Sequence, residues 1–548
     1  MKKNYLLMGL AGLLAACKVS VPQSAMLKGY QPKATQVVTS DKGVVTAAHP
    51  LAVRAGTIML EKGGNAVDAA VATGFALAVV EPSMSGLGGR LQAIVRLPNG
   101  DIRGVDATTQ APASYQAATA PKGADGYATI GLPGVVAGLT KLLQQYGTLP
   151  LAVVMAPAIR YAEEGFAVLP GEAARQASVK KMLMKYTGTR RYFLKQDSIP
   201  YKAGEILVQT DLATTLKAIA EGGRDAFYKG AVGQKIAADI QANGGVFTAQ
   251  DLADYQALDA QLLSTSYRGY DVHALSMPCY GAITLEMLNL METRPLSRYS
   301  DADWASSLYQ AMKLAYRDRP KQKKDSIQIL VSKAYARTLA GQMQIAGPAA
   351  QARVTGSDTL SVGHTTHLST ADQSGMMVAL TQSLGPVMGS GVATPGLGFM
   401  YAQTLGGGYL ASMKGGERAS SHISPVLLTK GGKPFMALGA AGGDLIPTAV
   451  VSVISRVIDR KLPLATAVAA PRVHPADKET MLMETRTGLG WEAAVVDAEK
   501  ARGFTVREVP QSGRFGRVHA IRFDTRKKRI SGAADPDWEG EARAPQKP

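Results

Sequence analysis

Cysteine is nearly absent from this chain, which excludes a scaffold held together by disulfides. Only Cys17 and Cys279 occur among 548 residues, too few for a disulfide framework. The seven histidines show no close ligand spacing such as His-x-x-x-His, so the sequence predicts neither a metal site nor a bound cofactor. Beyond the N-terminus no apolar run is long enough to predict a transmembrane helix.

Positive charge, by contrast, is plentiful. The formal net charge of +17 would suit a nucleic acid or an anionic membrane as partner. The two densest basic runs, residues 317–324 and 526–529, contain no aromatic side chains on which bases could stack. We therefore interpret them as solvated surface and expect no nucleic-acid partner; attraction to an anionic envelope surface is the alternative.

The N-terminal residues have the pattern of a targeting segment. A charged start precedes an apolar run at residues 6–16 that is too short to span a bilayer. The run ends in Leu-Ala-Ala-Cys, which resembles a bacterial lipoprotein signal and predicts lipidation of Cys17; an ordinary signal peptide is the alternative. Lys18 is not the aspartate associated with inner-membrane retention, so we expect a lipid-anchored outer-membrane lipoprotein on the periplasmic side. Residues 1–17 are then the signal peptide and residues 18–42 a polar tether.

Helical and strand patterns are mixed through the rest of the chain. Hydrophobic residues make up 46% of it, ample for a large core. Asn65 is a good N-cap for a helix at residues 66–80, which is apolar on nearly every face and so buried between layers. A strand at residues 435–438 leads through glycines into a helix at residues 444–459. These patterns predict an α/β fold.

The sequence Gly-His-Thr-Thr-His-Leu-Ser at residues 363–369 carries the candidate chemistry. It opens a predicted strand at residues 365–370, and a turn and a second strand at residues 376–384 follow. A threonine hydroxyl needs an adjacent base to act as a nucleophile, and a free α-amine at a chain terminus can be that base. Thr365 would gain such an amine if the bond after His364 were cut. A Thr-Thr pair that merely starts a strand is the alternative.

This stretch, with Val-Ala-Leu-Thr-Gln-Ser at residues 378–383, resembles the processing site of the γ-glutamyltransferase (glutathione hydrolase) family of N-terminal-nucleophile hydrolases. The resemblance extends from about Gly43 to Pro536. It implies a four-layer αββα sandwich and self-cleavage into a large fragment, with a folded body at residues 43–364, and a small fragment at residues 365–548. The two fragments would remain associated in one combined fold.

The resemblance also assigns residues around the nucleophile. Gly442 and Gly443 match the family's oxyanion pair, and Ser420 and Ser421 match the serines that contact the substrate α-carboxylate. Ser383 falls where the family often has a second threonine that positions the nucleophile.

Other ligands of the family are missing. Thr108 stands where the family has an arginine for the α-carboxylate, and a hydroxyl cannot replace a bidentate guanidinium without loss of affinity. The family's asparagine falls at Gly385, and its acidic residue for the α-amine falls near Gly406. In this segment Gln403 is the remaining candidate substrate contact. Arg90, where the family usually has glycine, is a candidate displaced cation.

Three functions remain open on the sequence. The first is a self-processing hydrolase or transferase of γ-glutamyl amides such as glutathione. The second is an acylase for another small-molecule amide, for example a glutaryl-type substrate. The third is an envelope lipoprotein that keeps the fold without turnover. The retained nucleophile and oxyanion residues argue against the third, and the vacated pocket argues against assuming the first.

Overall fold

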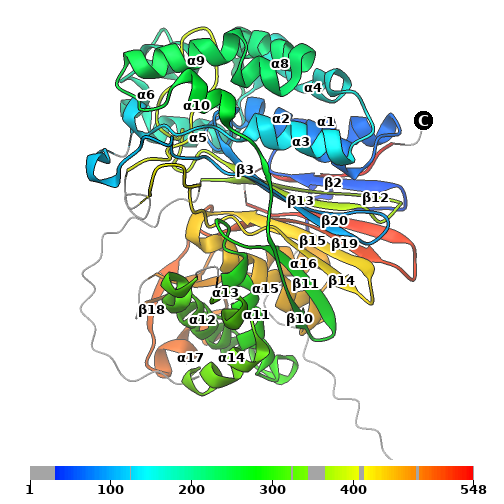
Figure 1. The fold of residues 1–548 in the computed structure, drawn as a ribbon. Coiled ribbons are helices and arrows are strands. Elements are labelled where there is room, and N and C mark those ends of the chain that lie inside the picture. Colours follow the sequence, from blue (N-terminus) through cyan, green and yellow to red (C-terminus); the bar gives the residue numbers. More distant parts are fainter. Residues whose placement is uncertain are drawn as a thin grey trace, which may run out of the picture.

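Two seven-stranded sheets packed face to face form the centre of the molecule, with helices on both outer sides (Figure 1). The computed structural model describes residues 31–121, 123, 125–322, 325–343, 364–406, 413–476, 480–537 and 539–546. This arrangement is the predicted four-layer αββα sandwich. Within the described residues no helix combines the length and apolar character needed to cross a membrane. Cys17 lies outside these residues, so its lipidation remains a prediction.

Sheet 1 holds the segment that begins at the predicted nucleophile. Every pair of neighbouring strands in it is antiparallel. In spatial order its strands are β21 (Glu541–Arg543), β2 (Gly43–Ala47), β12 (Thr366–Asp372), β13 (Met377–Ser383), β3 (Arg90–Arg96), β4 (Ile102–Ala107) and β9 (Leu258–Asp259).

Sheet 2 carries the predicted oxyanion turn at the end of one strand. In spatial order its strands are β1 (Val37–Ser40), β20 (Arg529–Ala534), β19 (Arg517–Asp524), β15 (Lys433–Ala441), β14 (Val426–Lys430), β11 (Tyr270–Leu275) and β10 (Leu262–Tyr267). The remaining strands form small satellite sheets: β5 (Phe166–Ala167), β6 (Leu194–Lys195), β7 (Ile199–Pro200), β8 (Ile206–Leu207), β16 (Val473–Pro475), β17 (Thr480–Glu484) and β18 (Thr505–Val509).

The helices fall into two groups, one on each outer side (Figure 1). On the side of sheet 1 lie α1 (Pro50–Glu61), α2 (Ala66–Val80), α3 (Val135–Tyr146), α4 (Leu151–Glu164), α5 (Pro170–Ser178), α6 (Lys180–Leu183), α7 (Thr187–Phe193), α8 (Thr210–Tyr228), α9 (Ala231–Ala242) and α10 (Ala249–Asp254). On the side of sheet 2 lie α11 (Gly281–Glu292), α12 (Asp301–Asp318), α13 (Ile327–Leu330), α14 (Lys333–Leu339), α15 (Ile446–Ile458), α16 (Leu464–Ala469) and α17 (Ala493–Ala501).

The predicted fragments are interleaved rather than side by side. Sheet 1 takes β2, β3, β4 and β9 from before residue 364 and β12, β13 and β21 from after it. Sheet 2 mixes the two parts in the same way, because β11 pairs with β14, and β1 pairs with β20. A cut at residue 364 would leave these backbone ladders and the shared core in place.

The predicted tether is too long by several residues. Val37–Ser40 forms β1, whose register with β20 runs from Val37 opposite Ala533 to Ser40 opposite Ile530. The folded body therefore begins before residue 43, because these residues complete the edge of sheet 2. The basic run at residues 317–324 begins inside a helix, since α12 continues to Asp318.

The helix predicted at residues 66–80 is confirmed as α2, and all of its residues are buried. Its N-terminus is fixed by a reciprocal capping box: the Asn65 side chain accepts from the amide of Asp68, and the Asp68 carboxylate accepts from the amide of Asn65 at 2.7 Å. The same carboxylate accepts from the amides of Thr148 and Leu149 and from the Thr148 hydroxyl. One buried side chain thus joins the start of α2 to the loop between α3 and α4.

Replacing this carboxylate should destabilise the fold. Asp68→Ala would remove the acceptor of four hydrogen bonds, so we expect the free energy of unfolding to fall by about 3 kcal/mol. The loss would be read as a lower midpoint in denaturant unfolding followed by circular dichroism. Asp254→Ala is the control, because Asp254 is exposed and, among the described residues, bonds just Gln250 within its own turn of helix. Equal midpoints for the two variants would contradict this role of Asp68.

Candidate active site

Thr365 lies immediately before β12, with its side chain turned toward the peptide bond that precedes it. The residue is 4% exposed. Its Oγ1 is 2.6 Å from the carbonyl oxygen of His364 and 3.1 Å from Oγ of Ser383. The Ser383 hydroxyl is 2.8 Å from the same carbonyl oxygen and accepts from the amide of Gly385 at 2.9 Å. Both hydroxyls therefore converge on the bond that self-cleavage would break.

This convergence follows from strand register. In the β12–β13 hairpin Thr366 is opposite Gln382 and His367 is opposite Thr381. Continuing the pairing by one residue sets Thr365 opposite Ser383, with both side chains on the same face of the sheet. The next pair on that face is also bonded, since Nδ1 of His367 is 2.8 Å from the Thr381 hydroxyl.

The predicted oxyanion turn lies at the same end of the sandwich as Thr365. β15 packs across β12, and a Cβ at Gly439 would meet the His367 ring at 2.4 Å. Two residues further on, Ala441 pairs with Arg517, whose charge contributes to lowering the pKa of His364. Gly442 and Gly443 follow directly, with φ of 147° and 60°, conformations that favour glycine.

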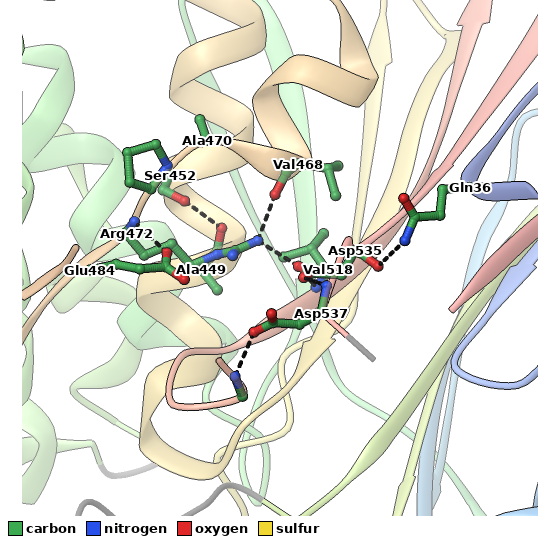
Figure 2. Close-up of polar contacts among 12 residues, drawn as sticks. Gln36, Ala449, Ser452, Val468, Ala470, Arg472, Glu484, Val518, Asp535 and Asp537 are labelled. Atoms are coloured by element: carbon green, nitrogen blue, oxygen red, sulfur yellow. Dashed lines mark hydrogen bonds and ion pairs between the residues drawn. The ribbon is translucent and has the colours of Figure 1, made fainter. Parts of the chain in front are cut away.

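A buried ionic network supports the strand beside this turn (Figure 2). Arg472 forms an ion pair with Asp535 at 2.6 Å, and its amide donates to Glu484 at 2.9 Å. The Asp535 carboxylate also accepts from the amide of Val518 at 2.9 Å. Val518 follows Arg517 in β19, so the network holds the strand that borders the turn.

The predicted substrate serines lie in the segment that leads into β14 and passes beside the residues that precede α11. The amide of Ser421 donates to the carbonyl of Pro278 at 2.9 Å, and its hydroxyl accepts from the amide of Ile423. Oγ of Ser420 is buried and has no hydrogen-bond partner among the described residues. A buried hydroxyl left without a partner costs free energy, which suits a group that is completed by a ligand.

Arg90 and Gln403 meet beside Ser383. The β3–β13 register places Arg90 directly opposite Ser383, hence on the same face as Thr365. Nη2 of Arg90 donates to the carbonyl oxygen of Gln403, and the amide of Gln403 donates to Leu384 at 3.0 Å. The structure thus brings Arg90, the candidate cation, into contact with Gln403, the remaining candidate substrate contact.

Thr108, a candidate substrate contact at the position of the family's arginine, is engaged within the protein. Continuing the β3–β4 register sets Thr108 opposite Arg90. The Thr108 hydroxyl, however, donates to Oδ1 of Asp106 at 2.6 Å, and the Thr108 amide donates to the same oxygen at 2.9 Å. Asp106 is held in turn by Arg418 at 3.4 Å. Because the single Thr108 proton is engaged, the hydroxyl is not placed to donate to a substrate carboxylate.

Comparison with known proteins identifies the family. A sequence model of the family described as gamma-glutamyltranspeptidase matches residues 52–544. The chain belongs to this family. It is 33% identical over 503 residues to the glutathione hydrolase proenzyme of Escherichia coli K12, covering 85% of this chain and 86% of that protein. It is 31% identical to the acylase ACY 1 proenzyme of Pseudomonas sp. SE83, covering 89% and 90% of the two chains. The crystal structure of cephalosporin acylase from Bacillus halodurans superposes with a TM-score of 0.85 at 30% identity, covering 95% and 99%.

Sequence reasoning missed an aromatic and cationic cluster beside the serine segment. The Tyr280 ring is fully buried, with the His422 ring 4.4 Å from it and the Arg319 guanidinium 4.4 Å over it. The Tyr316 hydroxyl donates to the carbonyl of Asp444, the residue after the oxyanion turn, at 2.8 Å. Arg319 lies in a run that we interpreted as solvated surface, and no local pattern distinguishes it.

Histidines around the site are held neutral by burial. Burial, with Arg517 and Arg175 nearby, lowers the pKa of His364 to about 3. Burial lowers the pKa of His422 to about 4, with Asp444 acting in the opposite direction. Burial also lowers the pKa of His474 to about 4, again against Asp444. Protonating these rings requires charging a desolvated group.

This burial predicts a pH-dependent stability. The pKa of His474 is about 6.5 when unfolded and about 4 when folded, so the unfolded state binds more protons between these values. Stability should therefore fall as the pH falls from 6.5 to 4, by about 1.4 kcal/mol per pH unit for this group. His474→Gln should remove the pH-dependent loss of stability that comes from His474. The free energy of unfolding of this variant, measured in urea, should therefore fall less than that of the wild type as the pH falls. Gln250→Ala, which changes no titratable group, should stay parallel to the wild type; parallel curves for both variants would refute the assignment.

Proposed function

We propose that the protein is a self-processing N-terminal-threonine hydrolase and transferase that cleaves γ-glutamyl-type amide bonds through an acyl-enzyme on Thr365. The observation that carries this proposal is the 2.6 Å approach of the Thr365 hydroxyl to the His364 carbonyl oxygen, with Ser383 on the same oxygen. Family membership supports the reaction type, and relatives named glutathione hydrolase support the acyl group.

Self-cleavage would begin with attack of Thr365 Oγ1 on the carbonyl carbon of His364. The C–N bond breaks as a proton moves to the nitrogen of Thr365, which leaves an ester between the two residues. Water then hydrolyses the ester, giving a carboxylate on His364 and a free hydroxyl and α-amine on Thr365. Ser383, which can donate to the carbonyl oxygen, stabilises the negative charge that develops there.

Turnover would use the same hydroxyl with the new amine as its base. Oγ1 attacks the substrate amide carbon, its proton passes through the amine to the leaving nitrogen, and the acyl group stays on Thr365 as an ester. The turn at Gly442 and Gly443 would stabilise the oxyanion. Water or an amino compound then takes the acyl group. No metal is needed for any step, and Ser420 and Ser421 would hold the substrate carboxylate.

An acylase for an amide without a γ-glutamyl group is the second candidate. The observation that favours it is at Thr108, whose hydroxyl is engaged by Asp106 instead of replacing the family's arginine. Relatives named acylase, and the likeness to a cephalosporin acylase structure, support the same alternative.

Variants of the hairpin test the nucleophile. Thr365→Ala should give a single intact chain without hydrolysis of a γ-glutamyl anilide, because both reactions need the hydroxyl. Ser383→Ala should slow self-cleavage by about 100-fold, the usual loss when one oxyanion donor is removed. The measurement is the denatured mass with the N-terminal residue of each fragment, and the small fragment should begin at Thr365.

Ser374→Ala is the matched control at the far end of the same hairpin, where its hydroxyl bonds Asp372. It should cleave at the wild-type rate. An intact Thr365→Ala chain that still turns over the anilide would contradict the proposal. An intact wild-type chain without turnover would favour a non-catalytic envelope lipoprotein.

We also propose that the chain is anchored at the periplasmic face of the outer membrane by lipid on Cys17. The Leu-Ala-Ala-Cys sequence supports this, and residues 18–36 leave a polar segment before β1. Cys17→Ala should move the protein from the outer-membrane fraction to the soluble fraction, because it removes the site of lipidation. Lys18→Asp is the control for sorting and should shift the lipoprotein to the inner membrane. Membrane association of Cys17→Ala would refute the anchor.

A further inference from the structure

Arg90 lies beside the segment in which, by the resemblance, side chains of the family's substrate pocket are missing. By that resemblance the family's asparagine falls at Gly385 and its acidic residue for the substrate α-amine falls near Gly406, and glycine stands at both positions here. A Cβ at Gly406 would lie 2.5 Å from the carbonyl oxygen of Pro121, which leaves no room for an acidic side chain. A Cβ at Gly385 would lie 3.6 Å from Nη2 of Arg90, so the guanidinium borders the space of the absent asparagine.

The guanidinium is fixed in this position. Arg90 is 2% exposed, and Nη2 donates to the carbonyl oxygen of Gln403. Its backbone pairs with Ser383, which bonds Thr365. The charge therefore lies in the first layer of side chains around the nucleophile and cannot leave for solvent.

The candidate carboxylate site lies next to the same charge. Gln92, two residues from Arg90 on the same face of β3, contacts Cys279. Pro278, adjacent to Cys279, accepts from the amide of Ser421. The serine segment therefore passes beside this end of β3. The pKa of His422 agrees with this placement. Burial is the main cause of its lowering, and the charge of Arg90 is one of the smaller causes.

We infer that Arg90 is a specificity-determining residue that inverts the charge preference of the acyl pocket. A cation where the family binds an ammonium repels that ammonium and attracts a carboxylate. The preferred acyl donor is then a monoamide of a linear dicarboxylic acid of the glutaryl type, which has the γ-glutamyl skeleton without its α-ammonium. This inference rests on the proposed Thr365 chemistry for turnover and, within it, favours the second candidate, an acylase, over hydrolysis of γ-glutamyl amides. The binding preference itself does not depend on turnover.

Glutarate and L-glutamate form a matched pair of probes because they differ only in the ammonium group. Isothermal titration of the purified full-length protein should show glutarate binding at least about 10-fold more tightly than L-glutamate, since like charges in a buried site strongly oppose binding. Arg90→Gly, which restores the family's glycine, should lower this ratio at least about 10-fold. Arg90→Lys, which keeps the positive charge, should still bind glutarate more tightly than L-glutamate.

Arg96→Gln is the control variant at the other end of β3, where Arg96 bonds the carbonyls of Gly375 and Gly432. It should leave the ratio unchanged. A ratio that favours L-glutamate in the wild type, or no binding of either acid, overturns the inference. So does a ratio that Arg90→Gly leaves unchanged in a variant with wild-type circular dichroism.

Kinetics with glutaryl and γ-glutamyl anilides separate this inference from the proposed function. In the processed wild type, kcat/KM should favour the glutaryl anilide, and Arg90→Gly should raise kcat/KM for the γ-glutamyl anilide. If neither anilide is hydrolysed while glutarate still binds preferentially, the proposed function fails and the role of Arg90 stands. If both anilides are hydrolysed equally well before and after Arg90→Gly, the role of Arg90 fails and the proposed function stands.

Discussion

The antiparallel pairing of β12 with β13 is the constraint on which the site depends. Its register sets Thr365 opposite Ser383, and the pairing of β13 with β3 sets Ser383 opposite Arg90. Because side chains alternate between the faces of a sheet, a slip of one residue would turn all three away from the space between the sheets. The hydrogen bond between His367 and Thr381 and the bonds of Ser383 fix the register from within.

Sheet 2 supplies the predicted oxyanion turn, which sheet 1 lacks. β15 crosses β12 closely only because Gly439 leaves space for the His367 ring, and this approach places the turn after Ala441 near Thr365. The network around Arg472 and Asp535 holds the neighbouring strand from behind. Buried ion pairs add little net stability, and their clearer effect here is to specify one arrangement of the strand ends.

Self-cleavage and stability are compatible because the two parts of the chain do not form separate bodies. Each sheet combines strands from before and after residue 364, so a single cut removes no backbone ladder. The change is local: a terminus forms at Thr365, and the hydroxyls that now meet the His364 carbonyl become free for another acyl group. The chemistry of processing and the chemistry of turnover thus share one set of side chains.

The sequence by itself determined the fold class, the buried helix at residues 66–80 and the hairpin that begins at Thr365, because local periodicity and the processing motif encode them. Through the resemblance it also predicted that family ligands are absent at Thr108, Gly385 and Gly406. Only the tertiary structure decided what replaces them. The engagement of Thr108 by Asp106, the position of Arg319 over the Tyr280 ring and the position of Arg90 beside Gly385 depend on strand register and sheet packing. Such contacts join residues far apart in the chain, and no local pattern records them.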